Sequence, residues 1–551
     1  MKKLCLLLLL TVSLNLCLSQ TYRYEPYRKE VRSTKNVIVM IPDGTSIGVV
    51  SAARWYKIYN NLGNSLFIDP YICGTVKTYS SNAPIVDSAP ATSCYMTGML
   101  MQAGNVSIYP LNDAENDIVT VDSTMAYQPL ATILEAAKIE QNKSTGLVVT
   151  CEFTHATPAD CAAHHYNRGD YKIIASQMAY QNLDVMFGSG NDFVSDDMIS
   201  HFKDKNIKYI KDNLFAFRYL NNEKIWALFG NRAMPYNLDR NVNNTPSLEE
   251  MTKKAIEILS NNENGFFLMV EGSQVDWAAH ANDAIACITE FIAFDNAVGV
   301  ALDFAKKDGN TTVIIMPDHG TGGFSIGNYN LRGYDRASLE KLFEQISKYK
   351  KTAEGLEKIL INEKPEKIRQ IIKYYTDIDI SEEELNKLVT SKNYNFENSE
   401  KNDTRPVMRE VLAQIMNSKT YFGFTTNGHT GEEVFLAAYH PQGDIPRGMN
   451  KNIEINHYLS DVLGLQTKLP ELTDKIFAKH TVVFADYETV IDKSGVFPVL
   501  IVKNEQKILE IPAYKSVAFL NGIPFDIGSV TVYIDKNDTF YLSKMLLEKI
   551  E

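Results

Sequence analysis

The chain has 551 residues, of which 45% are hydrophobic and 22% are charged, values close to the average of globular proteins. A chain of this length can bury a large core, which excludes a disordered, collagen-like or small disulfide-stapled protein. The formal charge is −12 and no block of basic residues stands out, so the composition argues against a nucleic acid as a specific partner.

The N-terminus has the pattern of a secretory signal peptide. A short basic start is followed by a mostly apolar run over residues 4–18 and by the small residue Ser19, and the run is too short to span a membrane. We predict that residues 1–19 are cleaved and that the protein is secreted or periplasmic. A lipid anchor at Cys17 is the weaker alternative, because Leu16 is a poor match to the small residue that lipoprotein processing prefers. No later stretch reaches 18 apolar residues, so we expect no transmembrane segment.

The cysteines leave two possibilities open. Five of the seven lie beyond the predicted signal peptide, and an exported protein can form disulfides. Cys151 and Cys161 could therefore close a short loop, or all five could be buried free thiols.

Between about residues 36 and 465, short apolar runs alternate with helical patterns. Continuous runs rich in β-branched residues predict strands that are buried on both faces. In residues 247–259, Ser247 and Glu250 form a capping-box pair at the start of an amphipathic helix. This order predicts a large, mainly parallel α/β sheet flanked by helices on both faces, with ligands at the carboxyl ends of the strands. The predicted strands lie in residues 36–44, 145–152, 265–273, 311–320 and 433–440.

Two further regions differ from this pattern. Residues 325–425 are rich in Lys, Glu and Tyr and include a capping box at Ser381 and Glu384, which predicts a helical insertion with a solvated, charged face. In residues 476–551 the period changes to two, with turn signals such as Asn521-Gly522. This change predicts a small β-rich C-terminal module.

Metal-binding side chains gather where the predicted strands end. Any one of them has an ordinary structural explanation, as a turn former, a helix cap or a surface histidine. Together they offer mixed oxygen and nitrogen donors that suit Zn²⁺, and they exceed what one four-coordinate ion needs, which points to two or three ions. Paired metals suit a phosphoryl displacement. The candidate ligands are Asp43, Glu271, Asp276, His280, Asp318, His319 and His429.

A candidate nucleophile lies at Ser88, in the segment PIVDSAPATSCYMTGM (84–99). The segment has no G-x-S-x-G elbow, so a metal ion or the amides of a helix N-terminus would have to stabilise the serine alkoxide. The structural alternative is that Ser88 only caps the helix that starts near Pro90.

Six segments together resemble the successive motifs of alkaline phosphatases, in the family's order. The resemblance covers about residues 36–465 and implies a catalytic domain over residues 20–465, with the insertion at 325–425 as a crown-like element. The segments are DSAPAT (87–92), HATPADCAAHHYNR (155–168), LFGNRAMPYNLDR (228–240), EGSQVDWAAH (271–280), DHGTGG (318–323) and GHTGEE (428–433).

The resemblance assigns roles to individual residues. One Zn²⁺ would be held by Asp276, His280 and His429, and a second Zn²⁺ by Asp43, Asp318 and His319. One Mg²⁺ would be shared by Asp43, Thr157 and Glu271, with His155 close to it. Ser88 would form a phosphoserine intermediate, and Arg168 would bind the substrate phosphate through its planar fork.

The activity implied is that of an alkaline phosphatase, a metal-dependent enzyme that hydrolyses phosphate monoesters. One alternative is a phosphodiesterase or nucleotide pyrophosphatase on the same metal core, although the presence of Thr157, Glu271 and Arg168 favours monoesters. The other alternative is a non-catalytic surface-binding protein. Crown elements lie at subunit contacts in this family, so a homodimer is expected as well. The module at 476–551 lies outside the resemblance, and surface attachment, substrate access and stabilisation are all open roles for it.

Overall fold

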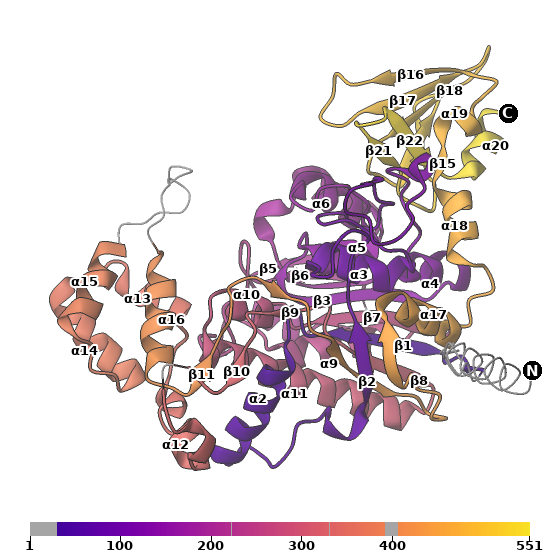
Figure 1. Ribbon diagram of the computed structural model, residues 1–551. Coiled ribbons are helices and arrows are strands. Elements are labelled where there is room, and N and C mark those ends of the chain that lie inside the picture. Colours follow the sequence, from indigo (N-terminus) through magenta and orange to yellow (C-terminus); the bar gives the residue numbers. More distant parts are fainter. Residues whose placement is uncertain (1–29, 222, 330, 392–405) are drawn as a thin grey trace, which may run out of the picture. The chain divides into compact units, whose positions relative to one another are not determined.

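The computed structural model describes residues 30–221, 223–329, 331–391 and 406–551 (Figure 1). The predicted signal peptide, including Cys17, lies outside these residues. The segment up to Val31 is a unit separate from Arg32–Glu551, and the fold described here is that of the second unit.

A ten-stranded sheet forms the centre of this unit. All five apolar runs predicted as strands belong to it. Nine strands run in the same direction, whereas β13 is antiparallel to both of its neighbours, β2 and β8. The predicted mainly parallel sheet is therefore confirmed. The strand order is β14 (Gly448–Lys451), β2 (Ile72–Lys77), β13 (Val434–Tyr439), β8 (Thr311–Ile315), β1 (Asn36–Ile41), β7 (Phe266–Glu271), β3 (Ser144–Glu152), β4 (Val185–Ser189), β6 (Ile225–Leu228) and β5 (Lys208–Lys211).

Helices cover both faces of the sheet (Figure 1). The apolar run of β1 is buried along its whole length because its side chains alternate between the two faces. Ile38 and Met40 belong to the main hydrophobic core. One face is covered by α2 (Ile47–Tyr59), α9 (Leu248–Leu259) and α11 (Ala284–Asp308), and the other by α3 (Ser88–Thr97), α4 (Ile133–Gln141), α5 (Ala156–Ala162) and α17 (Asn452–Leu463).

Two of these helices test particular predictions. In α9, Ser247 is the N-cap and accepts a hydrogen bond from the Glu250 amide at 3.0 Å, while the Glu250 carboxylate pairs with Arg218 at 2.6 Å. Helix α11 is long and apolar enough to span a membrane by length and composition alone, but 78% of its apolar window is buried within the protein. A buried helix of this kind is typical of a protein core.

The insertion is helical, as predicted. Its ends are joined by a short antiparallel pair, β10 (Ser325–Ile326) and β11 (Phe422–Gly423). The capping box forms, since the Ser381 amide donates to Glu384 at 2.7 Å and the Glu384 amide donates to Ser381 Oγ at 3.1 Å. The helices are α12 (Leu339–Phe343), α13 (Ala353–Leu360), α14 (Pro365–Thr376), α15 (Glu382–Ser391) and α16 (Met408–Ser418).

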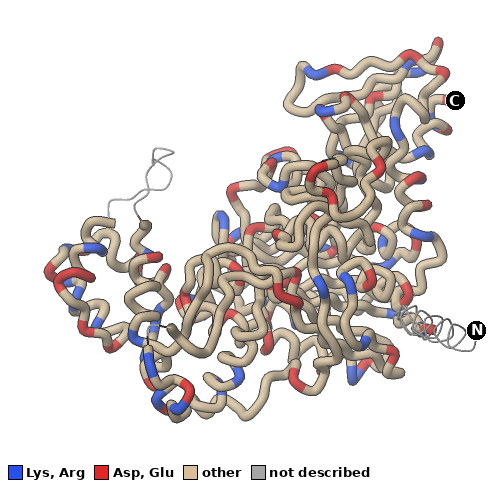
Figure 2. The backbone as a smooth tube through the Cα atoms, in the orientation of Figure 1, with Lys and Arg blue, Asp and Glu red and all other residues tan. Residues whose placement is uncertain are grey.

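Charged residues of both signs are frequent along the insertion (Figure 2). One example is the ion pair between Lys387 and Glu383, at 2.7 Å, whose side chains are 61% and 78% exposed. Exposed pairs of this kind contribute little to stability, so they mark a solvated face.

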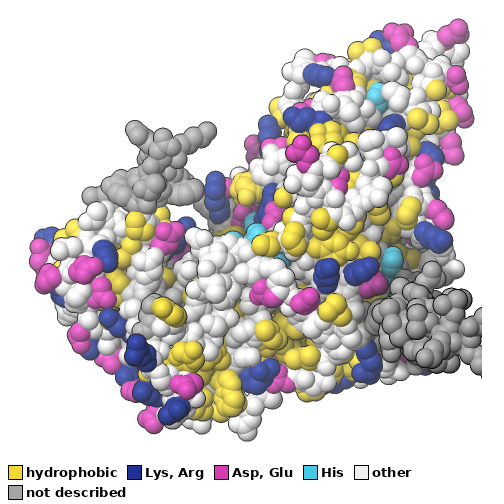
Figure 3. Space-filling model, in the orientation of Figure 1, with side chains coloured by type: hydrophobic (Ala, Val, Ile, Leu, Met, Phe, Trp, Pro, Cys, Tyr) yellow, Lys and Arg dark blue, Asp and Glu magenta, His cyan; other side chains and the backbone are white. Residues whose placement is uncertain are grey.

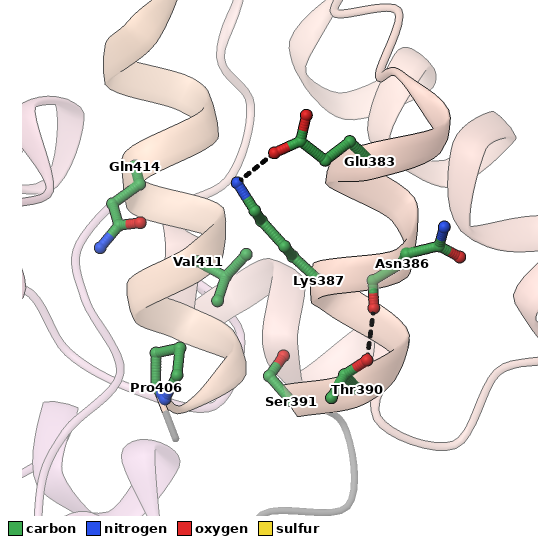
Figure 4. Close-up of a pocket in the computed structure, with 8 residues that line it drawn as sticks. All are labelled: Glu383, Asn386, Lys387, Thr390, Ser391, Pro406, Val411 and Gln414. Atoms are coloured by element: carbon green, nitrogen blue, oxygen red, sulfur yellow. Dashed lines mark hydrogen bonds and ion pairs between the residues drawn. The ribbon is translucent and has the colours of Figure 1, made fainter. Parts of the chain in front are cut away.

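A cavity of about 620 Å³ lies between α15 and α16 (Figure 4). On the face drawn in Figure 3, basic side chains are interspersed with acidic ones.

The C-terminal module, residues 476–551, is β-rich, as predicted, and has its own hydrophobic core. Asn521 and Gly522 form the hairpin turn between the strands Val517–Leu520 and Ile523–Asp526, with φ of 49° and 78°, the conformation that two-residue hairpin turns require. A five-stranded antiparallel sheet contains β16 (Glu488–Asp492), β17 (Val499–Lys503), β18 (Ile508–Pro512), β19 (Val517–Leu520) and β20 (Ile523–Asp526), and a three-stranded sheet contains β15 (Ala478–Lys479), β22 (Thr539–Leu542) and β21 (Val532–Ile534).

The cysteines of the described residues are all free thiols. Of the two possibilities that the sequence left open, the disulfide between Cys151 and Cys161 is therefore not formed. Both side chains are fully buried.

Candidate metal centre and active site

The candidate ligands converge at one edge of the central sheet. Asp43 follows the end of β1, Glu271 is the last residue of β7, and Asp318 follows the end of β8. Because these strands are parallel, their carboxyl ends lie at the same edge. Strand β13 runs in the opposite direction, so His429, which precedes it, also comes to this edge. His429 is held there by a short pairing of its strand β12 (His429–Thr430) with β9 (Gly320–Thr321).

A first cluster contains Asp276, His280 and His429, whose ligand atoms all lie within 4.8 Å of one another. Asp276 and His280 lie four residues apart on α10 (Gln274–His280) and therefore share a helical face. The Nε2 atom of His280 is 3.3 Å from Asp276 Oδ2 and 3.2 Å from His429 Nε2. Its Nδ1 bonds the Asn427 carbonyl at 2.6 Å, which directs Nε2 into the cluster.

The two histidines of this cluster have pKa values shifted in opposite directions. Burial and the neighbouring His319 lower the pKa of His429 to about 3, which keeps the imidazole neutral. Burial alone would lower the pKa of His280, but the hydrogen bond and charge of Asp276 outweigh it and raise the pKa to about 8. Thr321 donates to Asp276 Oδ1 at 2.6 Å and fixes the carboxylate.

A second cluster contains Asp43, Asp318 and His319, which are completely buried. The His319 Nε2 atom lies 3.5 Å from both Asp43 Oδ1 and Asp318 Oδ2. Ser88 Oγ is 3.2 Å from the same nitrogen. The oxygen of the candidate nucleophile and those of two candidate ligands therefore all lie within 3.5 Å of Nε2 of the third, His319.

The second cluster fits a bound cation. Both carboxylate oxygens of Asp43 and one of Asp318 are buried and have no hydrogen-bond partner among the described residues. Burial raises the pKa of Asp43 well above its usual range, and the nearby charges of Asp318, Asp276 and Glu271 raise it further. Buried carboxylates at such close range are stable only when paired or when coordinated to a metal, and oxygen and imidazole donors suit Zn²⁺.

A third cluster contains Cys151, His155 and Glu271. The Cys151 thiol lies 3.6 Å from Glu271 Oε2, and the other Glu271 oxygen has no partner in the described part of the chain. Burial raises the pKa of Glu271 to about 8. Thr157, on α5, is completely buried, and its hydroxyl is likewise unpartnered. The His155 ring packs edge-on against Trp277, with 5.6 Å between centroids.

Ser88 is the first residue of α3, and the N-cap position belongs to Asp87. The alternative that Ser88 is only the cap of this helix is therefore wrong. Its side chain is 2% exposed and contacts His319. Backbone amides at the start of α3 also favour a negative charge.

Arg168 lies on the loop between α5 and α6 (Tyr171–Tyr180). Its Nη1 donates to Asp87 Oδ2 at 3.2 Å, and its Nη2 lies 3.1 Å from His155 Nε2. Because a guanidinium can only donate, His155 accepts through Nε2. The guanidinium therefore lies beside both the nucleophile segment and the third cluster.

Three residues of this site were not expected from the sequence. For Cys151 the sequence predicts a disulfide or a buried free thiol and no place in the site, although its position near the end of β3 offers a signal. Asp87 adjoins Ser88 and Thr321 lies in the DHGTGG segment, but a single sequence contains no sign that they bond Arg168 and Asp276.

Comparisons with known proteins agree with this geometry. A family model described as alkaline phosphatase matches residues 34–465. Alkaline phosphatase 4 of Bacillus subtilis (strain 168) is 31% identical over 460 residues, covering 81% of this chain and 92% of that protein. Alkaline phosphatase 3 of the same organism is 33% identical over 449 residues, covering 79% of this chain and 90% of that protein.

Solved structures show the same fold. A cold-active alkaline phosphatase from Shewanella sp. superposes with a TM-score of 0.66 at 26% identity and covers 78% of this chain and 99% of its own. A histidine-to-aspartate variant of the alkaline phosphatase from the Antarctic bacterium TAB5, with Mg bound in its M3 site, has a TM-score of 0.55 at 26% identity and covers 79% of this chain and 100% of its own. From its motifs, its fold and these relatives, the chain belongs to the alkaline phosphatase family.

Proposed function

We propose that the protein hydrolyses phosphate monoesters to an alcohol and inorganic phosphate through a phosphoserine intermediate on Ser88. The observation that carries this proposal is that three features lie together: the Ser88 hydroxyl, the buried cluster that contains His319, and the Arg168 guanidinium. Ser88 Oγ contacts His319 within a buried ligand cluster, and the residue before Ser88 bonds the Arg168 guanidinium. A nucleophile and a phosphate-binding cation therefore lie side by side.

We propose three metal ions for the ligand clusters. The first Zn²⁺ would be held by Asp276, His280 and His429, and the second by Asp43, Asp318 and His319. Mg²⁺ would be held by Asp43, Thr157 and Glu271, with His155 close by. When bound, these ions supply Lewis acidity and neutralise the charge that develops on the attacking and leaving oxygens.

The unpartnered buried oxygens of Asp43, Asp318, Glu271 and Thr157 support this assignment, since each needs a cation or a donor. Glu271 and Thr157 are hard oxygen donors, which suit Mg²⁺. Mg in the M3 site of the TAB5 variant agrees with that choice. The nearby His155 and Cys151 are softer donors, so the identity of the third ion is the part of the proposal that most needs measurement.

The chain's own residues account for the two displacements. In the first, Ser88 Oγ bonds to phosphorus as the bond from phosphorus to the alcohol oxygen breaks, and the proton that Ser88 loses ends on the alcohol. In the second, water bonds to the same phosphorus as the bond to Ser88 Oγ breaks, one proton of the water ends on Ser88 Oγ, and inorganic phosphate is released. In both steps Arg168 binds two phosphate oxygens, and the N-terminal amides of α3 favour the anion.

Two parts of the proposal are supported by the sequence and the family alone. We propose that the protein is exported after cleavage of residues 1–19, which sequencing of the mature N-terminus would test. We also propose a homodimer with the insertion at the subunit contact, which sedimentation of the purified protein would test.

The experiment that tests the activity is a comparison of initial rates on an aryl phosphate monoester and the matching diester, with metal analysis of the same sample. We expect a monoester preference of several orders of magnitude, with two Zn²⁺ and one Mg²⁺ per chain. A diester preference with only two ions would remove the roles of Thr157, Glu271 and Arg168. An inactive protein with its metals bound would favour a binding function instead.

A further inference from the structure

The C-terminal module, residues 476–551, begins after the end of the family match at residue 465, and neither the metal clusters nor the proposed reaction uses it. Many of its contacts fall on one short stretch of the catalytic domain. That stretch, residues 164–182, contains the loop that carries Arg168 and the helix α6 that follows it.

On the N-terminal side of Arg168, the module contacts two aromatic rings. Phe477 packs against His164, with 4.5 Å between ring centroids. Tyr166 donates its hydroxyl proton to Asp535 Oδ1 at 2.7 Å, and the Lys536 ammonium lies 5.4 Å from the centroid of the Tyr166 ring. Both module residues belong to the turn between β21 and β22.

On the C-terminal side of Arg168, the module holds α6. The Lys172 ammonium lies 5.5 Å from the centroid of the Phe497 ring, and Ile173 packs against the module's hydrophobic core. Ser176 Oγ donates to the Tyr514 carbonyl at 3.0 Å. The C-terminal module therefore contacts the chain on both sides of Arg168.

Within the catalytic domain the loop has contacts of its own, since His165 and Val106 exchange two backbone hydrogen bonds at 2.8 and 2.9 Å. The Arg168 amide donates to the Gly104 carbonyl at 2.8 Å, and the guanidinium bonds Asp87 and His155. The Tyr166 ring stacks on His165 at 4.4 Å, so a force on Tyr166 is transmitted to the residues next to Arg168. A group that must meet two phosphate oxygens at once tolerates little displacement.

We propose that the C-terminal module positions Arg168 for the substrate phosphate, with Tyr166 and Asp535 as the positioning residues. The inference rests on the proposed function, in which Arg168 binds that phosphate. It assigns the module a role in substrate binding that general stabilisation of the fold would not produce.

The test uses the full-length, metal-loaded enzyme and measures kcat, KM for an aryl phosphate monoester and inhibition by inorganic phosphate. Asp535→Ala removes the acceptor for Tyr166, and we expect KM and the phosphate inhibition constant to rise about three- to tenfold, the range for the net contribution of one ordinary hydrogen bond. We expect kcat to change by less than about twofold, because Arg168 would contact the phosphate in the bound substrate and in the transition state alike. Asp535→Asn keeps an acceptor oxygen and should restore both constants.

A matched control removes a different module contact. Lys515 pairs with Asp197 at 2.7 Å on α7 (Asp196–Asp204) and lies 5.0 Å from the centroid of the Tyr180 ring, at the end of α6 that is distant from Arg168 in the sequence. Lys515→Ala should therefore leave KM and phosphate inhibition unchanged. Equal effects of Asp535→Ala and Lys515→Ala would overturn the inference in favour of general docking. Unchanged constants in Asp535→Ala would also overturn it.

A double variant separates this inference from the proposed function. Arg168→Ala should weaken phosphate inhibition strongly, and adding Asp535→Ala to it should have no further effect, since the positioned group is gone. If Arg168→Ala weakens phosphate binding and Asp535→Ala does not, the inference alone is wrong. If Arg168→Ala leaves phosphate binding unchanged, the proposed role of Arg168 fails and the inference fails with it.

Discussion

The Arg168 guanidinium lies 3.2 Å from the carboxylate of Asp87, the residue immediately before Ser88. The two side chains are only 26% and 21% exposed, and they come from segments 81 residues apart in the sequence. This ion pair links the proposed nucleophile to the proposed phosphate-binding group, and it leads to the first prediction.

Asp87→Ala should weaken phosphate binding without destroying catalysis. Without its carboxylate partner the guanidinium samples more orientations, so it has to be ordered each time a phosphate binds. We expect KM for a phosphate monoester and the phosphate inhibition constant to rise together by about three- to tenfold, the scale of the net contribution of one ordinary hydrogen bond. Steady-state kinetics with phosphate as inhibitor would measure both. A large fall in kcat with unchanged phosphate binding would contradict this role of Asp87.

Ser88→Ala should abolish turnover, because it removes the hydroxyl that lies beside His319 Nε2. Metal content and circular dichroism should stay near those of the unaltered protein, since the change removes a single hydroxyl, whose hydrogen bond is to His319. A suitable control is Ser195→Ala, which removes the N-cap of α7. The control should lose about 1 kcal/mol of stability and keep its activity. A Ser88→Ala variant with the full hydrolytic rate would show that the nucleophile is another group.

Removing the metal ions should cost both activity and stability. Asp43, Asp318 and Glu271 are completely buried, and their mutual repulsion would be left uncompensated. Each ion that binds only the folded state stabilises it by about 3–4 kcal/mol when its free concentration is 100–1,000 times Kd. We therefore expect calorimetry to show a large fall in Tm with a chelator, reversed by Zn²⁺ and Mg²⁺. An unchanged Tm would mean that these clusters do not hold ions.

Gly44→Ala should disturb the first cluster. Gly44 has φ of +61°, and a Cβ there would lie 2.3 Å from Asp276 Oδ1 and 2.8 Å from the Asp276 Cα. The side chain has no room unless α10 moves, so we expect loss of zinc together with loss of activity. Metal analysis of the purified variant would show it.

Gly309→Ala is the control for that substitution. Gly309 also has a positive φ, +71°, but a Cβ there would meet nothing within 4 Å. It should incur only the backbone strain, about 1–2 kcal/mol, and keep its zinc. Equal zinc contents in the two variants would contradict the steric explanation.

Glu290, on α11, should make stability depend on pH. Burial raises its pKa to about 8, and its carboxylate accepts from the Asn237 amide. Below about pH 4 the group is protonated in both the folded and unfolded states. Between about pH 4 and pH 8 only the folded state keeps the proton, so the free energy of unfolding falls as pH rises through this window, on the order of a few kcal/mol in total.

The variant Glu290→Gln keeps the acceptor oxygen and cannot ionise. Compared with it, the unaltered protein should lose stability steadily from pH 5 to pH 8 in chemical denaturation. Because metal loss at low pH affects both proteins alike, the difference between them isolates Glu290. A difference that does not vary with pH would show that Glu290 is already ionised in the folded protein.

Much of the fold could be predicted from the sequence, because the signals are local. The run NVIVMI of β1 is apolar at every position, which suits a strand covered on both faces. Asn521-Gly522 marks a hairpin because both residues tolerate a positive φ. The positions of Asp43, Glu271 and Asp318 at the ends of strands made a shared cluster predictable, since parallel strands bring their carboxyl ends to one edge.

The tertiary structure decided what depends on contacts between distant segments. Strand β13 is antiparallel to its neighbours, and nothing in its own residues states its direction. Cys151 lies beside Glu271 across 120 residues of chain, and Tyr166 bonds Asp535 across 369. A period of 2 or 3.6 residues tells which face of an element is buried, but not which partner covers it. Partners are chosen by how whole elements pack, and so the sequence determined the strands, the turns and the candidate ligands, while packing decided which side chains meet.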